Sequence, residues 1–257
     1  MYSNHTKSRN AVLLIAAILL IGCNRKAFTH VSDARLNQFD TSWTETNSKI
    51  DKMIRPFREQ IKQEMNEVVG YSSKEMVKAR PESALGNVLA DMLLNFGIKE
   101  IDPEIDLCVM NYGGFRVPIP EGQITRGKVF ELMPFENTLT LVTITQKQLA
   151  ELADHIYQKG GEPFSSSSIV HLITLDSTSL FTFYDDEMNS KEEYRILTSN
   201  YLADGGDGFS VFLNGTKRED SRWLIRSAII KSLQENTSIE KPLNGTIDGR
   251  IILDANE

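Results

Sequence analysis

Histidine and cysteine are scarce in this chain, which has four histidines and two cysteines among its 257 residues. A protein metal site needs His, Cys, Asp or Glu side chains grouped at ligand spacing, and none of the histidines stands in such a group. His155, beside Asp154, is expected at the surface or its boundary. The chain also lacks a Gly-x-Ser-x-Gly elbow and a P-loop. These absences argue against hydrolysis by this polypeptide alone.

Long hydrophobic runs are absent as well, because the one sustained apolar run, residues 11–21, is too short to span a bilayer. It follows a basic start and precedes Gly22 and Cys23, which is the order of a bacterial lipoprotein signal. We therefore expect residues 1–22 to be a signal peptide and Cys23 to be the acylated first residue of the mature chain. A plain cleavable signal with an incidental cysteine and a membrane anchor helix are the alternatives.

The chain has fewer basic residues than acidic residues. Loss of residues 1–22 would remove Lys7 and Arg9 and no acidic residue, so the 28 basic residues fall to 26 against 35 acidic ones, a formal net charge of −9. A protein that binds a nucleic acid polymer needs a basic face, so we exclude that class of partner. The expected location is the bacterial cell envelope, with the chain held to a membrane by its lipid.

Cys108 is the one cysteine that acylation of Cys23 would leave, so the mature fold is expected to have no internal disulfide. Within the apolar stretch 105–110 it is most simply a small buried hydrophobe. A catalytic thiol is the less favoured interpretation, because no histidine lies nearby in the sequence to activate it.

The remainder divides into a polar tether, residues 23–48, and a folded part, residues 49–257. Apolar periodicity predicts helices, and β-branched alternating runs predict strands. The predicted helices cover residues 49–67, 88–96, 146–158 and 220–235, the last with Asp220 or Ser221 as N-cap. The predicted strands cover residues 68–72, 107–110, 138–145, 169–175, 180–184, 194–198 and 210–213. Because several strands follow one another without a helix between them, the fold class is α+β.

The first loop that could carry chemistry is Asn111-Tyr-Gly-Gly-Phe-Arg116, directly after an apolar strand. Its paired glycines, among them Gly113, permit positive φ and a close approach of the backbone to a ligand. Asn111 and Arg116 supply hydrogen-bond donors for a base or an oxyanion. An ordinary turn after a strand remains the alternative.

The second loop is Asn200-Tyr-Leu-Ala-Asp-Gly-Gly-Asp-Gly-Phe209. It can present Tyr201 as a flat stacking surface and Asp207 as an acceptor for sugar hydroxyls. A calcium loop would need an acid or amide at Gly206 and a glutamate at Gly215, so the sequence does not support one. A tight structural turn is the remaining alternative.

These loops belong to a wider resemblance. Five motifs, in order, resemble the C-terminal domain of the 5'-nucleotidase family: Glu82-Ser-Ala-Leu-Gly-Asn-Val-Leu-Ala-Asp, Asn111-Tyr-Gly-Gly-Phe-Arg, Met133-Pro-Phe135, Asn200-Tyr-Leu-Ala-Asp-Gly-Gly-Asp-Gly-Phe and Asp248-Gly-Arg-Ile. The resemblance implies mixed sheets flanked by helices in α/β/β/α layers. It also implies a domain that binds the nucleoside of a nucleotide.

The resemblance also implies a role for particular residues. Phe135 and Tyr201 would hold the base between them, with Tyr201 in a position that is commonly phenylalanine in the family. Asn111 and Asn200 would contact the edge of the base, and Asp207 would accept hydrogen bonds from the ribose. Arg116 would reach the ribose or phosphate side. Arg80 lies near the position of a further family arginine, although Pro81 separates it from the Glu82 motif, and it is a candidate phosphate-side residue.

The family's complete enzyme carries a second, metallophosphatase domain, whose Asp-x-His, Gly-Asn-His-Glu and Gly-His-x-His motifs do not occur in these 257 residues. We therefore expect no catalytic residue and no bound cofactor in this chain. The hypothesis is a nucleoside- or nucleotide-recognition component of a split 5'-nucleotidase, with a separate metallophosphatase chain that holds the divalent metals. A non-catalytic nucleoside-binding surface lipoprotein and a relic with an empty pocket are the alternatives.

Overall fold

A computed structural model describes residues 49–175 and 178–252 of the chain. The chain divides into a unit of residues 1–51 and a unit of residues 52–257, and nearly all described elements belong to the second. The predicted signal peptide, Cys23 and the tether lie outside the described residues. None of the helices in the described ranges combines the length and the apolar character that crossing a membrane requires.

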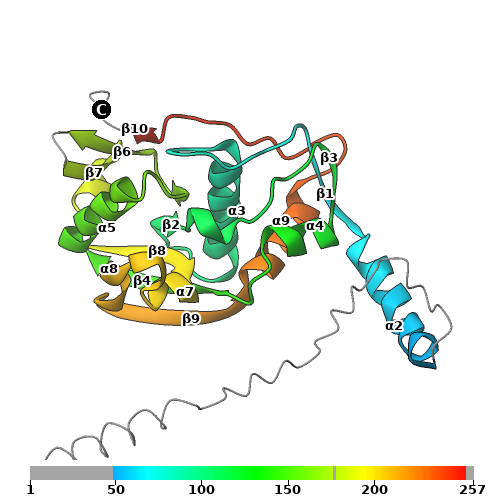
Figure 1. The fold of residues 1–257 in the computed structure, drawn as a ribbon. Helices are drawn as coiled ribbons and strands as arrows, with labels where there is room; N and C mark the ends of the chain where they lie inside the picture. Colours follow the sequence, from blue (N-terminus) through cyan, green and yellow to red (C-terminus); the bar gives the residue numbers. More distant parts are fainter. Residues whose placement is uncertain (1–48, 176–177, 253–257) are drawn as a thin grey trace, which may run out of the picture. The chain divides into compact units, whose positions relative to one another are not determined.

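Helices and strands are interspersed along the chain (Figure 1). The helices are α2 (Lys49–Met65), α3 (Ala84–Glu100), α4 (Arg126–Leu132), α5 (Gln146–Gln158), α6 (Asp186–Asn189), α7 (Asn200–Ala203), α8 (Ser210–Leu213) and α9 (Ile225–Asn236), with 3₁₀ turns η1 (Tyr112–Gly114) and η2 (Gly206–Gly208). The strands are β1 (Val68–Ser72), β2 (Leu107–Val109), β3 (Gly122–Thr125), β4 (Thr138–Thr145), β5 (Phe164–Ser166), β6 (Val170–Leu175), β7 (Thr178–Phe183), β8 (Glu193–Ser199), β9 (Lys217–Leu224) and β10 (Ile251–Ile252).

A five-stranded sheet with the order β5-β2-β8-β4-β9 forms the centre of the second unit. The pair β2 and β8 is parallel, and the other pairs of this sheet are antiparallel. A three-stranded sheet, β10-β6-β7, and the pair β1-β3 complete the strands. The sheets are thus mixed, which confirms the α+β prediction.

Side chains of the central strands are buried on both faces of the sheet. Along β4, Leu139 and Leu141 join one apolar cluster, whereas Val142 and Ile144 join another. Helices α3 and α9 pack in the first cluster, and α5 packs with the three-stranded sheet in the second (Figure 1). Because side chains alternate across a strand, a continuous apolar run such as β4 indicates burial on both sides.

The predicted strand 68–72 matches β1 residue for residue. The predicted strand β4 and helix α5 match the structure equally well. Their junction is marked in the sequence, because Thr145 caps α5 by accepting from the backbone N–H of Gln148 while the Gln148 side chain accepts from the backbone N–H of Thr145. This reciprocal capping box fixes where the helix begins. Cys108 is fully buried in β2, as expected for a small hydrophobic residue. This burial raises the pKa of its thiol.

The predicted helix 220–235 exists but begins too early, and the predicted strand 210–213 is wrong. Residues 217–224 form the edge strand β9 instead of the start of a helix, so Leu224 and neither Asp220 nor Ser221 is the N-cap of α9. The charged side chains of β9 are exposed, and its backbone hydrogen bonds with β4 decide its conformation. Residues 210–213 form the helical turn α8 instead of a strand, which allows the adjacent Val211 and Phe212 both to be buried.

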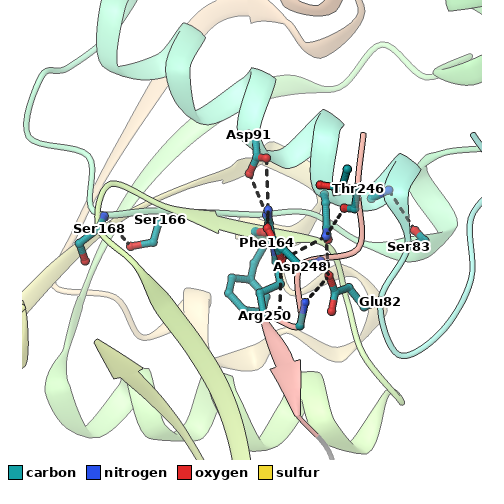
Figure 2. Close-up of polar contacts among 12 residues, drawn as sticks. Glu82, Ser83, Asp91, Phe164, Ser166, Ser168, Thr246, Asp248 and Arg250 are labelled. Carbon is teal, nitrogen blue, oxygen red and sulfur yellow. Dashed lines mark hydrogen bonds and ion pairs between the residues drawn. The ribbon is translucent and has the colours of Figure 1, made fainter. Parts of the chain in front are cut away.

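The C-terminal segment is fastened to α3 by a network of charged side chains (Figure 2). The Arg250 guanidinium donates to Asp91 Oδ1 at 2.7 Å, to the Phe164 carbonyl at 2.8 Å and to Asp248 Oδ2 at 2.6 Å. Asp91 lies on α3, and Phe164 opens β5. One arginine therefore ties the last strand to a helix and to the central sheet.

Glu82 continues this network at the start of α3 (Figure 2). Its Oε1 accepts from Asn87 Nδ2 at 2.5 Å and from the backbone N–H of Asp248 at 2.9 Å. Asn87 also donates to the Thr246 carbonyl at 2.9 Å. The first and last of the five sequence motifs thus meet in one structural contact, which we call the C-terminal clamp.

We predict that Arg250→Ala lowers the free energy of unfolding by about 2 kcal/mol, because it removes charge-assisted hydrogen bonds from a largely buried guanidinium. Chemical denaturation with a spectroscopic readout measures this change. Arg218→Ala is the matched control, since Arg218 also bridges two aspartates but is 37% exposed against 12% for Arg250. The control should cost less than about 1 kcal/mol. Equal losses for both variants would contradict the clamp.

Candidate functional site

Two loops that are far apart in the sequence meet at one edge of the central sheet. Strands β2 and β8 are adjacent and parallel, with Cys108 paired to Leu197. The carboxyl ends of parallel neighbours lie at the same edge, where α/β sheets commonly form ligand crevices. The loop after β2 contains η1, and the loop after β8 contains α7 and η2.

A third segment reaches this edge from the opposite direction. Strand β4 runs antiparallel to β8, with Leu139 paired to Ser199. The residues just before β4, which include Phe135 and Asn137, therefore lie beside the end of β8. The sheet topology thus brings three sequence motifs to one place.

A cavity of about 300 Å³ opens between these segments. Six of the sequence-predicted site residues line it: Asn111, Gly113, Arg116, Phe135, Tyr201 and Asp207. Gly114 and Asn137 also line it and were not predicted. Asn137 carries no signal of its own in the sequence beyond its place two residues after Phe135. Phe135 is 41% exposed and Tyr201 is 43% exposed. Both rings are therefore accessible to a ligand.

Asn200 and Arg80 do not line this cavity. Asn200 Oδ1 accepts from the backbone N–H of Thr138 at 3.1 Å, which joins the loop after β8 to the start of β4. Arg80 donates to the Gly161 carbonyl at 2.7 Å and to Glu162 at 3.2 Å. Contacts of Asn200 with a base and of Arg80 with a phosphate stay predictions.

Asp207 is the polar centre of the site. Its Oδ2 accepts from Asn111 Nδ2 at 2.6 Å, and its Oδ1 accepts from the Tyr201 hydroxyl at 2.9 Å. Within the described part of the chain it is the one non-glycine residue with positive φ, at 52°. A non-glycine residue keeps such a conformation only where its surroundings impose it, often at a functional site.

Glycines shape both loops, but in different ways. Gly205 and Gly208 have positive φ, whereas Gly113 and Gly114 do not, so the expected left-handed backbone is absent from the first loop. Gly114 is needed for space instead, because a Cβ there would lie 2.7 Å from Asn111 Oδ1. At Gly206 a Cβ would lie 2.5 Å from the Tyr201 ring. The backbone of Gly206 therefore packs against that ring.

A group of cations lies beside the cavity, around the ring of Tyr112. Lys78 Nζ is 4.2 Å and Arg80 Cζ is 4.5 Å from the ring centroid. Burial, then the nearby charges of Arg116 and Arg80, lower the pKa of Lys78. Glu162, whose pKa burial raises, accepts from the Tyr112 backbone N–H and from Arg80. Lys78 and Glu162 belong to no sequence motif and were not predicted.

A larger cavity of about 690 Å³ lies elsewhere, lined mainly by charged and polar residues without an aromatic ring. Its central groups already pair with one another, as Lys191 does with Asp106 at 2.5 Å. Size alone therefore does not identify the site, and the smaller cavity combines aromatic and polar groups as ligand sites do.

The described residues do not fit a metal centre. In residues 49–175 and 178–252, no three His, Cys, Asp or Glu side chains are grouped closely enough to hold an ion. His155 instead lies edge-on to Phe209, with 4.3 Å between ring centroids. Its Nε2 is buried and has no hydrogen-bond partner among the described residues.

The chain is similar to several known proteins in sequence. The family described as "5'-nucleotidase, C-terminal domain" matches residues 68–214. The trifunctional nucleotide phosphoesterase protein YfkN of Bacillus subtilis is 28% identical over 228 residues, and human 5'-nucleotidase is 28% identical over 185 residues. These alignments cover 81% and 62% of this chain but only 15% and 32% of the two relatives.

The fold is also similar to a solved structure. The 5'-nucleotidase precursor from Thermus thermophilus superposes with a TM-score of 0.65 at 23% identity, over 80% of this chain and 43% of that one. This chain therefore corresponds to a part of each of these proteins.

We predict that acidification destabilises the loop that carries Asp207, through His155. Burial and the charge of Lys159 lower the pKa of His155 below 6.5. The folded state thus binds this proton less readily than the unfolded state, so stability is lost as pH falls from about 6.5 through the lowered folded pKa. Denaturation of the wild type and of His155→Gln between about pH 7.5 and pH 5 measures this. The variant should lose this part of the pH dependence, and an unchanged slope would contradict the prediction.

Proposed function

This chain belongs to the 5'-nucleotidase family by its C-terminal domain, and from that premise we propose that it is the nucleoside- or nucleotide-recognition component of a split 5'-nucleotidase. The observation that carries the proposal is the cavity of about 300 Å³ in which Phe135, Tyr201, Asn111 and Asp207 come together. Two exposed aromatic rings and one oriented carboxylate suit a ligand that has a flat base and a sugar.

Base and sugar would be recognised by different groups. Phe135 and Tyr201 would stack on the base, an interaction worth about 1 to 3 kcal/mol per base with little demand on its identity. Asn111 would contact the base edge, with Asn200 proposed beside it. Asp207 would accept hydrogen bonds from ribose hydroxyls, because an ionised carboxylate has more acceptor positions than its two donors in the protein use.

Phosphate would lie on the side of the cations. Arg116 lines the cavity, and Lys78 and Arg80 stand together at the ring of Tyr112. Arginine forks bind phosphate oxygens well, and lysine adds a point charge. These positive groups are local on a chain whose formal net charge is −7, so they would favour a small anion over a polyanion.

Hydrolysis would need metal-binding groups close together, and the described residues do not provide them. We propose that a separate metallophosphatase chain holds the divalent metals, which would supply an activated water and stabilise charge on the phosphate. The recognition chain would then bind the nucleoside part and orient the ester toward that partner. Association between chains would take the place of a covalent link between domains.

The first residues of the sequence support a proposal about location. We propose that export, acylation of Cys23 and the polar residues 24–48 hold the recognition domain at a membrane of the bacterial cell envelope. Nucleotides outside the cytoplasm would then meet the domain where they are taken up for catabolism.

We predict that the purified chain, supplied with Mg²⁺ or Mn²⁺, releases no phosphate from nucleoside monophosphates. Addition of a metallophosphatase chain from the same organism should produce activity that depends on this chain. Appreciable turnover by the chain alone would overturn the split arrangement. Nucleoside binding with no activity after every such chain is added would favour a non-catalytic binding lipoprotein instead.

We further predict that Phe135→Ala weakens nucleoside binding by about tenfold, which corresponds to the loss of one stacking surface. Isothermal titration with adenosine measures this. Leu213→Ala is the control, because Leu213 is also a large exposed side chain but does not line the cavity. If the wild type gives neither heat nor a thermal shift with any nucleoside, the domain is a relic and the proposed function is wrong.

A further inference from the structure

The hydroxyl of Tyr201 makes contacts that a stacking surface does not require. It donates to Asp207 Oδ1 at 2.9 Å and accepts from the Asp207 backbone N–H at 3.2 Å. Both residues belong to the loop after β8, and both line the cavity. The hydroxyl thus contacts the very residue that is suited to bind a sugar.

The ring of Tyr201 is fixed independently of this hydroxyl. Its helical turn α7 is capped by Ser199, and the Gly206 backbone packs so closely against the ring that a Cβ would lie 2.5 to 2.6 Å from three ring carbons. Loss of the hydroxyl would therefore leave the ring in place. The two parts of the side chain can act separately.

The Asp207 carboxylate, in contrast, depends on its donors. It is exposed, and Tyr201 and Asn111 each donate to one of its oxygens from separate loops. Two donors on two oxygens fix both the rotamer and the plane of the carboxylate. An ionised carboxylate has about four acceptor positions, so about one remains on each oxygen. The remaining pair matches two hydroxyls on adjacent carbons.

We propose that Tyr201 is a positioning residue, whose hydroxyl orients Asp207 toward the vicinal diol of a ribonucleoside. This inference rests on the proposed function and extends it to the sugar, because it makes the Tyr201 hydroxyl a determinant of selectivity for ribose over sugars that lack the diol. Preorganisation of the carboxylate reduces the entropy lost when the diol binds. The aromatic ring contributes to affinity for every nucleoside, and the hydroxyl contributes only where the diol is present.

A titration tests the contact without any ligand. The hydrogen bond to Asp207 raises the pKa of Tyr201 above its ordinary value of 10.0. Ultraviolet difference titration of wild type against Tyr201→Phe isolates this phenol among the seven tyrosines. Asp207→Ala should return its pKa toward that ordinary value. An unchanged pKa in Asp207→Ala would overturn the proposal, because it would show that the two groups are not coupled.

Calorimetric binding of adenosine and 2',3'-dideoxyadenosine to the full chain tests the role in recognition. Tyr201→Phe should weaken adenosine binding by about three- to tenfold, the loss of one hydrogen-bonded orienting group, and leave dideoxyadenosine binding unchanged. Tyr184→Phe is the matched control, since it removes a hydroxyl that bonds to His171 outside the cavity. It should alter neither affinity.

Three results would overturn the proposal while nucleoside binding itself persists. Equal weakening of both nucleosides would show that Tyr201→Phe perturbs stacking. No change in either would show that the hydroxyl has no role, and tighter adenosine binding would show that it competes with the sugar. Failure of the wild type to bind either nucleoside would overturn the proposed function and this role together, so the two failures are distinguishable.

Discussion

The carboxylate of Asp207 is the contact on which the candidate site depends. It receives Asn111 at 2.6 Å from the loop after β2 and the Tyr201 hydroxyl at 2.9 Å from its own loop. Without this carboxylate, the hydrogen bond that joins the loop after β2 to the loop after β8 would be lost. The positive φ of Asp207 is the conformational cost of this arrangement. The parallel pairing of β2 with β8 makes the contact possible, since it places both loops at one edge of the sheet.

The five sequence motifs serve two different purposes. Those that contain Asn111, Phe135 and Tyr201 reach the cavity, whereas those that begin at Glu82 and at Asp248 meet in the C-terminal clamp. The clamp also holds the first residue of β5, which pairs with β2. It therefore supports the strand from which the first site loop leaves. Motifs of one family can thus form either a binding surface or the structure that supports it.

Local chemistry explains which parts of the fold could be predicted. Strand β4 and helix α5 were predictable because β-branched residues, an amphipathic period and a capping box all agree there. Strand β9 was not, because its sequence lacks the apolar alternation of a strand and its pairing with β4 sets its conformation. Six residues of the site were found through motifs, but Lys78 and Glu162 reach its border through packing alone. Local sequence patterns do not show which strands are neighbours or in which direction they run. They therefore do not show which distant residues come into contact at the border of the site.

A crystal structure of this chain with adenosine would show directly whether Asp207 binds the sugar. We expect the base between Phe135 and Tyr201, with the ribose diol within hydrogen-bond distance of both oxygens of Asp207. The Asn111 and Tyr201 donors should stay on that carboxylate. Adenosine bound elsewhere, for example in the charged cavity beside Asp106, or a sugar directed away from Asp207, would contradict it.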